Sequence, residues 1–333
     1  MSTIRFGLAG CGVIGEVHAR AIASLPQTEL VAVADVPAAF SAAEKLGAEY
    51  GASACADFTM MLERQDVDVV NICTPSGLHA QQAIEAMSRG KHVIVEKPMA
   101  LTRRDIDGML EAQHRAGVKL SVISQRRFEP GVRTLYRLIQ RGGLGRIVLA
   151  VAHVPWWRTQ GYYDSGAWRG TETLDGGVLM NQAIHVVDLL QWMVGPVEAV
   201  QGYVATVAHV MECEDTAVAT LRFSNGALGT ISATTGANPG SALQLEILGD
   251  GGSAVLLDGD LRVAGPAADE PDDTGSYDPR EYLDAHAAQI ADVIQAVREN
   301  RSPLVDGNEG RRSVEIILAI LESAVQKREV RVA

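Results

Sequence analysis

The 333-residue sequence has little cysteine and no long apolar run. Its four cysteines show no spacing typical of a metal site, so we expect reduced thiols and no bound metal at Cys11, Cys55, Cys73 and Cys213. No run of about 18 apolar residues occurs, which argues against a membrane-spanning helix. The first residues lack the basic segment, apolar run and cleavage site of a signal peptide, so we expect a cytoplasmic protein.

Positive charge is also scarce. The sequence holds 29 Lys and Arg against 41 Asp and Glu, a formal net charge of −12. Nucleic acids and anionic membranes attract basic surfaces, so neither is an expected partner. Hydrophobic residues make up 47% of the chain and charged residues 21%, as in globular proteins. Because single cores stop growing at about 250 to 300 residues, two domains are expected.

Apolar strand-like runs alternate with helical segments through residue 124. Strands are expected at 4–9, 29–35, 66–75, 91–98 and 118–124, and helices at 15–25, 38–49, 77–90 and 101–117. Apolar strands that alternate with helices are typical of a doubly wound parallel sheet with both faces covered. Residues 1–124 are therefore predicted to form the first domain.

The pattern changes in residues 125–333. Strand-like runs follow one another without helices at 146–155, 197–209, 214–235 and 241–257, and Ser224–Ala227 is a hairpin turn signal. Residues 265–280 are rich in Pro, Asp and Gly and indicate a loop. Helices are expected at 281–299 and 308–327, and they can pack back towards the first domain. The second domain is therefore predicted to be α+β, with a large, open, mostly antiparallel sheet.

A glycine-rich turn joins the first strand to the first helix. It comprises Gly10, Gly12, Val13, Ile14 and Gly15, and Asp35 follows 20 residues later at the end of the second strand. This spacing is typical of a dinucleotide site, in which glycines let the backbone approach the pyrophosphate and the acid binds the ribose. A carboxylate repels a 2′-phosphate, so we predict NAD rather than NADP. The alternative is a glycine-rich turn that binds nothing.

Two later strands end in polar sequences where a doubly wound sheet binds its ligands. Thr74, Pro75 and His79 follow one strand, and Glu96 and Lys97 end the next. We interpret these two strand ends as neighbours of the cofactor, and place Lys97 beside it. Lys97 taken alone would be a surface lysine.

Three polar residues interrupt the apolar segment from Gly176 to Leu190. Asn181, His185 and Asp188 are spaced by four and three residues, which places them on one face of an α-helix. Histidine suits acid–base chemistry because its ordinary pKa is about 6.5. A buried helix favours a catalytic face, whereas a lone histidine would more often be a core residue. Asp188 is left open between a site residue and a stabilising partner.

Trp, Tyr and Arg are concentrated between Trp156 and Arg169. Aromatic rings stack on sugars, and guanidinium groups bind carboxylates or phosphates in pairs of hydrogen bonds. We therefore predict that Trp157, Arg158 and Arg169 contact the substrate. A subunit contact is the alternative, because the same residue types mark interfaces.

Several motifs together resemble the Gfo/Idh/MocA oxidoreductases. They are GLAGCGVIGEVHARAI, ICTPSGLHAQQAIEAMSRGKHVIVEKPMA, RRFEP, DGGVLMNQAIHVVDLLQWMVGPV and PLVDGNEGRRSVEIILAILESA. The resemblance implies a Rossmann domain, a second domain on an open sheet, and hydride transfer between nicotinamide and a sugar or cyclitol carbon. It assigns catalysis and substrate contacts to Lys97 and His185, a further substrate contact to Arg126, and a place near the cofactor to His18 and His79. Asn181 is predicted to bond a substrate hydroxyl as donor or acceptor. Many members carry Asp where this sequence has Asn181, which puts a proton relay through that position in doubt.

The segment 156–185 is similar to members that oxidise a UDP-linked N-acetylglucosaminuronic acid. The leading hypothesis is an NAD-dependent dehydrogenase of a sugar, sugar nucleotide or cyclitol. An NAD-dependent glycoside hydrolase and a non-catalytic dinucleotide-binding regulator are the alternatives. A broad open sheet would expose a large face in a monomer, and such faces usually bind a partner. We therefore also expect a homodimer or homotetramer through the second domain.

Overall fold

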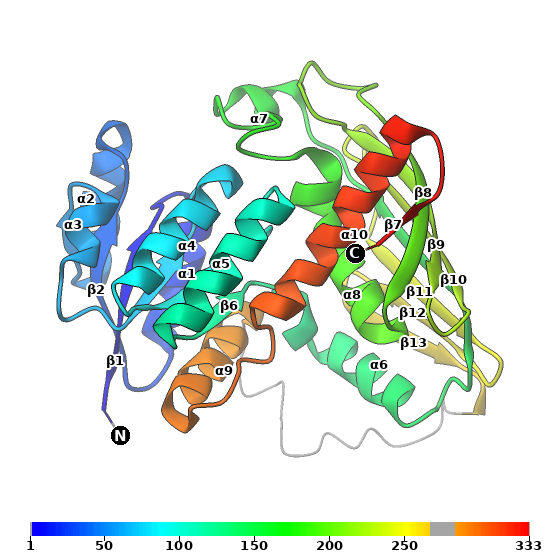
Figure 1. The fold of residues 1–333 in the computed structure, drawn as a ribbon, viewed down its shortest axis with the longest axis horizontal. Coiled ribbons are helices and arrows are strands. Elements are labelled where there is room, and N and C mark those ends of the chain that lie inside the picture. Colours follow the sequence, from blue (N-terminus) through cyan, green and yellow to red (C-terminus); the bar gives the residue numbers. More distant parts are fainter. Residues whose placement is uncertain (1, 267–283, 333) are drawn as a thin grey trace. The chain divides into compact units, whose positions relative to one another are not determined.

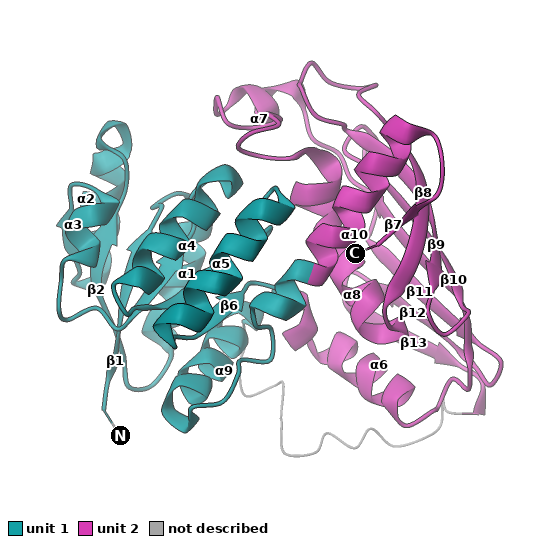
Figure 2. Cartoon of the chain, viewed as in Figure 1, with its two compact units in different colours: residues 1–125, 282–311 teal, residues 126–281, 312–333 magenta. Residues whose placement is uncertain are grey.

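The computed structural model describes residues 2–266 and 284–332. The chain divides into two compact units, shown in Figure 2. Unit 1 comprises residues 1–125 and 282–311, and unit 2 comprises residues 126–281 and 312–333. Most of the predicted loop at 265–280 lies outside the described residues.

Unit 1 contains a six-stranded parallel sheet with the order β3-β2-β1-β4-β5-β6. Its strands are β1 (Ile4–Ala9), β2 (Thr28–Ala34), β3 (Ser53–Cys55), β4 (Val69–Ile72), β5 (His92–Val95) and β6 (Leu120–Val122). This is the doubly wound order of dinucleotide-binding domains, whose ligands lie beyond the carboxyl ends of the strands. The predicted fold class of the first domain is confirmed, and β3 is the one strand of this sheet that was not expected.

Helices cover both faces of this sheet. They are α1 (Val13–Ser24), α2 (Phe40–Tyr50), α3 (Phe58–Leu62), α4 (His79–Ser88), α5 (Arg103–Ala116) and α9 (Ala285–Glu299). Local signals set their ends, as at α5, where the hydroxyl of Thr102 accepts from the Asp105 N–H. Apolar residues of α1 and α9 share one core with β1 and β2. The late segment that carries α9 therefore belongs to unit 1.

Unit 2 contains an eight-stranded mixed sheet with the order β13-β12-β11-β7-β10-β9-β8-β14. Its strands are β7 (Ile147–Pro155), β8 (Val197–Ala205), β9 (Thr216–Phe223), β10 (Leu228–Thr234), β11 (Gln244–Gly249), β12 (Ser253–Leu257), β13 (Asp260–Ala264) and β14 (Val330–Arg331). Strands β7 and β10 pair in parallel, and the other neighbours are antiparallel. The prediction of an open, mostly antiparallel sheet is confirmed.

The helices that the structure describes in unit 2 leave one face of its sheet uncovered. They are α6 (Pro130–Gln140), α7 (Gln160–Asp164), α8 (Ile184–Val194) and the later turns of α10 (Gly307–Gln326), and α6, α8 and α10 lie on the same side of the sheet (Figure 1). Side chains of β9 alternate accordingly between buried and exposed. Within the described ranges, no helix is long and apolar enough to cross a membrane.

Candidate functional site

The glycine-rich turn lies where β1 passes into α1. Gly10 has a φ of +90°, and a Cβ there would lie 2.6 Å from the carbonyl of Cys73 at the end of β4. A Cβ on Gly15 would lie 2.1 Å from the carbonyl oxygen of Gly10. Only glycine therefore allows this close packing of turn, helix and strand. At Gly12 no atom of the described residues lies within 4 Å of the Cβ position, so the turn is open to them on that side.

Asp35 joins the end of β2 to the glycine-rich turn. Its Oδ2 accepts from the N–H of Cys11 at 2.7 Å, and its Oδ1 accepts from the N–H of Val36 at 2.8 Å. Among residues 2–266 and 284–332, no side chain caps the start of α1, so its first N–H groups can bind an anion. The open position at Gly12, this helix start and the Asp35 carboxylate together fit a dinucleotide.

The turn after β4 is held from inside by His79. The His79 ring is 1% exposed, and its Nδ1 and Nε2 lie 2.8 Å from the main-chain oxygens of Pro98 and Thr74. Burial lowers the pKa of His79 despite these two contacts. Thr74 donates its hydroxyl proton to Gln82. His79 thus ties the Thr74–Pro75 turn to the loop after Lys97, and the predicted cofactor contacts of these residues stay predictions.

Glu96 and Lys97 follow β5 at the same edge of the sheet as the glycine-rich turn. The main chain of Glu96 remains paired with β4 through a hydrogen bond to Ile72. Glu96 is a buried residue, 5% exposed, whose side chain contacts His18 of α1, whereas Lys97 is partly exposed. The structure therefore brings the predicted reactive lysine and the predicted dinucleotide turn to one edge of one sheet.

The helix that carries His185 departs from the regular α-helix expected for this segment. A π-helical turn covers Leu179–Ala183, and α8 begins at Ile184. The prediction of a regular α-helix through this segment was wrong, because the π-helical turn precedes α8. Asn181 and His185 are nevertheless the two residues between Gly177 and Gln191 that are not buried. Asp188 is buried and does not share their exposure.

Two buried carboxylates support the π-helical turn. Glu214 accepts from the N–H of Leu179 at 3.0 Å, and its main-chain oxygen accepts from Val178 at 2.9 Å. Asp175 accepts from the N–H of Gly170 at 2.7 Å and from the side-chain amide of Asn181. Burial raises the pKa of Glu214 to about 7. Sequence reasoning missed both carboxylates, because neither has a local spacing that relates it to His185.

The aromatic segment places two arginines on one ring. The Cζ of Arg169 lies 4.2 Å from the ring centre of Tyr162, and the Cζ of Arg158 lies 5.2 Å from the same centre. Within the part of the chain that the structure describes, neither guanidinium forms an ion pair with a carboxylate. Trp157 is 36% exposed. The two guanidinium groups, which lie over the Tyr162 ring, are suited to binding an anion.

Arg126 lies at the start of unit 2. Its Nη1 is 3.5 Å from the Glu129 carboxylate, and its side chain is 18% exposed. Its substrate contact stays a prediction, and the Glu129 carboxylate already balances part of the charge of its guanidinium.

Comparison with known proteins identifies both units. Residues 4–124 match the oxidoreductase family model with an NAD-binding Rossmann fold, and residues 132–255 match the GFO/IDH/MocA C-terminal domain. The prediction of an oxidoreductase with NAD as its cofactor is thereby confirmed at the level of the family.

Individual relatives extend over the whole chain. The WlbA dehydrogenase from Bordetella pertussis, solved in complex with NADH and UDP-GlcNAcA, is 37% identical, with a TM-score of 0.92 over 100% of this chain and 98% of that one. Myo-inositol 2-dehydrogenase from Thermotoga maritima is 27% identical over 98% of each chain. Levoglucosan dehydrogenase from Pseudarthrobacter phenanthrenivorans is 28% identical over 77% of this chain and 74% of its own. From its motifs, its two sheets and these likenesses, the chain belongs to the Gfo/Idh/MocA family of NAD-dependent oxidoreductases, whose members include sugar and cyclitol dehydrogenases.

Proposed function

We propose that this protein oxidises a secondary hydroxyl group of an anionic, UDP-linked sugar, with NAD as the oxidant. The observation that carries the proposal is the position of Lys97. It is a partly exposed lysine at the carboxyl end of β5, on the same sheet edge as the glycine-rich turn and Asp35. A cation at that edge lies where a substrate must meet the cofactor.

The reaction removes a proton from the hydroxyl group and a hydride from its carbon, which leaves a ketone. NAD, when bound, supplies the hydride acceptor. We assign the hydroxyl proton to His185, which is partly exposed on an otherwise buried helix and can act as the general base. The Lys97 ammonium stabilises the negative charge that develops on the substrate oxygen. Asn181, held by Asp175, is assigned a hydrogen bond to a substrate hydroxyl.

The arginine pair supports an anionic substrate. Arg158 and Arg169 share the ring of Tyr162, and Trp157 beside them is exposed for stacking on a sugar or base. Guanidinium groups bind carboxylates and phosphates, both of which occur in a UDP-linked sugar acid. The likeness to a dehydrogenase solved with UDP-GlcNAcA supports the same substrate class.

A substrate screen tests this function. The purified protein is mixed with NAD and with UDP-GlcNAcA, neutral UDP-GlcNAc, free sugars or myo-inositol, and NADH is followed by absorbance and fluorescence. Single-turnover conditions are included, so that NADH which stays bound is also detected. We expect NADH from UDP-GlcNAcA and little from its neutral counterpart. NADH formed from myo-inositol or a free sugar in preference to both UDP-sugars would reject the proposed substrate class.

The same screen separates the two alternatives. An NAD-dependent glycoside hydrolase would release sugar without a net gain of NADH. A non-catalytic regulator would bind the dinucleotide and turn over none of these compounds. Net NADH that depends on Lys97 is expected only from the proposed dehydrogenase.

Variants then test the assigned roles. Lys97→Ala and His185→Asn are each expected to lower kcat by about a hundredfold or more, because each removes a group that acts in the transition state. Arg158→Gln and Arg169→Gln are expected to raise KM for UDP-GlcNAcA about tenfold. Arg146→Gln is the matched control, because Arg146 is 79% exposed and pairs with Asp250. Unaltered turnover by Lys97→Ala would refute the mechanism.

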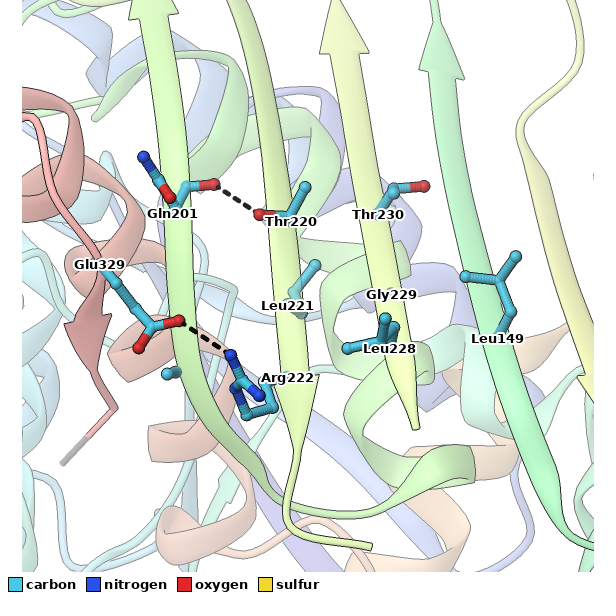
Figure 3. A pocket seen from close by; sticks show the side chains of 10 residues that line it. Leu149, Gln201, Thr220, Leu221, Arg222, Leu228, Gly229, Thr230 and Glu329 are labelled. Carbon is cyan, nitrogen blue, oxygen red and sulfur yellow. Dashed lines mark hydrogen bonds and ion pairs between the residues drawn. The ribbon is translucent and has the colours of Figure 1, made fainter. Parts of the chain in front are cut away.

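We also propose that the open face of the unit 2 sheet joins two copies of this chain. Large apolar side chains are exposed along four adjacent strands, at Val148 of β7, Tyr203 of β8, Val218 of β9 and Leu228 of β10. A pocket on the sheet is lined by residues that include Leu149 and Leu228, and also Arg222 and Glu329, which form an ion pair (Figure 3). An apolar face of this extent is typical of an interface. A homodimer or homotetramer through the sheet is the proposed assembly.

A further inference from the structure

Three ionisable side chains meet beside Lys97 within unit 1. They are His18 from α1, Glu96 from the end of β5 and His286 from α9, and their nearest ligand atoms all lie within 4.8 Å of one another. The His18 and Glu96 side chains are 1% and 7% exposed, and His286 is 14% exposed. Buried charges persist only when other groups pair with them, so this cluster needs a structural or functional reason.

The two oxygens of Glu96 have different partners. Its Oε1 accepts from Nε2 of His18 at 3.0 Å, and its Oε2 accepts from the main-chain N–H of Lys97 at 3.1 Å. The Nε2 of His286 lies 3.9 Å from the same Oε1. The carboxylate therefore bridges the first helix of the dinucleotide site and the main chain of the proposed reactive lysine.

The charges in this cluster are coupled. Burial opposes ionisation of Glu96, but His18, Lys97 and His286 outweigh it and hold the pKa of Glu96 well below its usual range. Burial also opposes protonation of His18, yet Cys73 and Glu96 outweigh it and raise the pKa of His18 to about 10. Glu96 is consequently an anion at neutral pH, in electrostatic contact with Lys97 and with His18, whose protonated form this anion favours.

Asn71 completes the environment of His18. Its side-chain amide lies 2.9 Å from Nδ1 of His18, and its Oδ1 has no hydrogen-bond partner among the described residues. Rotating this amide end for end would give the Nδ1–H of an imidazolium an oxygen acceptor. Both nitrogens of a charged His18 can thus be satisfied, by Asn71 on one side and Glu96 on the other.

We infer that His18 and Glu96 are positioning residues that set the place and the charge of Lys97. Glu96 holds the main chain of Lys97 in place and supplies the anion beside its ammonium group. His18 holds the Glu96 side chain in place and offsets part of its negative charge. The inference rests on the proposed function, because only there is Lys97 an acid–base group. Neither positioning residue has to touch the substrate, since both act through Lys97.

The first test reads the ionisation of Lys97 without any substrate. Competitive acetylation with trace acetic anhydride across pH, followed by mass spectrometry, gives the midpoint at which the amine of Lys97 becomes reactive. Glu96→Gln should lower this midpoint by about half a pH unit or more, because an anion beside the ammonium is lost. His18→Gln should raise it, because the Glu96 anion is then less neutralised. Midpoints that stay within the error of the wild type in both variants would overturn the inference.

A matched control uses the other end of the same strand. His92 begins β5, and its Nδ1 accepts from the main-chain N–H of Lys119. His92→Gln therefore removes a half-buried histidine from β5 without touching the cluster. Its Lys97 midpoint should equal that of the wild type, and an equal shift in this variant would count against a specific effect of Glu96. If Glu96→Gln does not fold, the opposite shift in His18→Gln still decides the question.

The second test uses turnover. Glu96→Gln and His18→Gln are expected to lower kcat about tenfold while KM and the Kd for NADH change less than about threefold. The basic limb of the pH profile should move in the same direction as the labelling midpoint in each variant. A loss of kcat with an unshifted pH profile would indicate a merely structural role. Full turnover by Lys97→Ala would refute the proposed function, whatever the labelling shows. An inactive Lys97→Ala together with unchanged midpoints and kcat in Glu96→Gln and His18→Gln would refute only the positioning inference.

Discussion

The guanidinium of Arg127 holds the carboxylate of Asp188 in a two-pronged ion pair inside unit 2. The Nε–Oδ2 distance is 2.8 Å and the Nη2–Oδ1 distance is 2.6 Å. Arg127 is 0% exposed and Asp188 is 3% exposed, and Trp192 lies over the guanidinium, with its ring centre 5.0 Å from Cζ. The sequence left open whether Asp188 is a site residue or a stabilising partner. Its carboxylate pairs with Arg127 in the core, so it is a stabilising partner.

The first prediction concerns this pair. Asp188→Ala should lower the free energy of unfolding by about 3 to 5 kcal/mol, because it leaves a buried guanidinium without its counter-charge. Urea denaturation followed by fluorescence measures the change. The double variant Arg127→Met, Asp188→Leu should lose much less, since it removes both charges together. A single variant within about 1 kcal/mol of the wild type would contradict the buried-pair interpretation.

The second prediction concerns cofactor choice. Asp35→Asn should lower the preference for NADH over NADPH by about tenfold or more, because the carboxylate no longer repels a 2′-phosphate. Fluorescence titration with the two reduced cofactors gives both Kd values. Asp57→Asn is the control, since Asp57 caps α3 by accepting from the N–H of Met60. A wild-type protein that binds NADPH more tightly than NADH would refute the assigned role of Asp35.

The third prediction concerns pH and Glu214. Its carboxyl ionises at about 7 in the folded protein, against an ordinary value of 4.5. A raised carboxyl pKa means that the folded state holds the proton more tightly, so Glu214 costs stability as pH rises from about 4.5 to about 7. Glu214→Gln removes this loss and keeps an oxygen for the N–H of Leu179.

Thermal unfolding measures this effect. The melting temperature of Glu214→Gln minus that of the wild type should increase by a few degrees from pH 5 to pH 8. Each kcal/mol of stability corresponds to about 2 to 4 °C in melting temperature. Glu198→Gln is the control, because that carboxylate is 45% exposed on β8. The opposite slope, or parallel curves for Glu214→Gln and the wild type, would show that Glu214 does not titrate in this window.

The fourth prediction concerns the proposed assembly. Val218→Glu with Leu228→Glu should convert the oligomer to monomer, because it buries charge in an apolar interface. Sedimentation velocity at several protein concentrations reads the change. Val325→Glu is the matched control, since Val325 is 82% exposed on α10 rather than on the sheet. A wild-type protein that sediments as a monomer at all concentrations would reject the assembly outright.

Local signals made most of the fold predictable. The alternation of strands and helices predicted the parallel sheet, Thr102 predicted the start of α5, and the Ser224–Ala227 turn predicted the hairpin of β9 and β10. Each of these depends on residues close together in the sequence, where spacing and backbone preference act directly. The short strands β3, β13 and β14 were missed, because such short segments become strands only when a neighbouring strand supplies their hydrogen bonds.

The sequence by itself determined the family motifs, the glycine-rich turn with Asp35, and the candidates Lys97 and His185. It could not decide which polar side chains are turned inward. Tertiary structure alone paired Arg127 with Asp188, set Glu214 beneath the π-helical turn, and joined His18 to Glu96 across 78 residues of sequence. The physical reason is that a buried charge must find its partner in space, and no periodicity along the chain records where that partner lies.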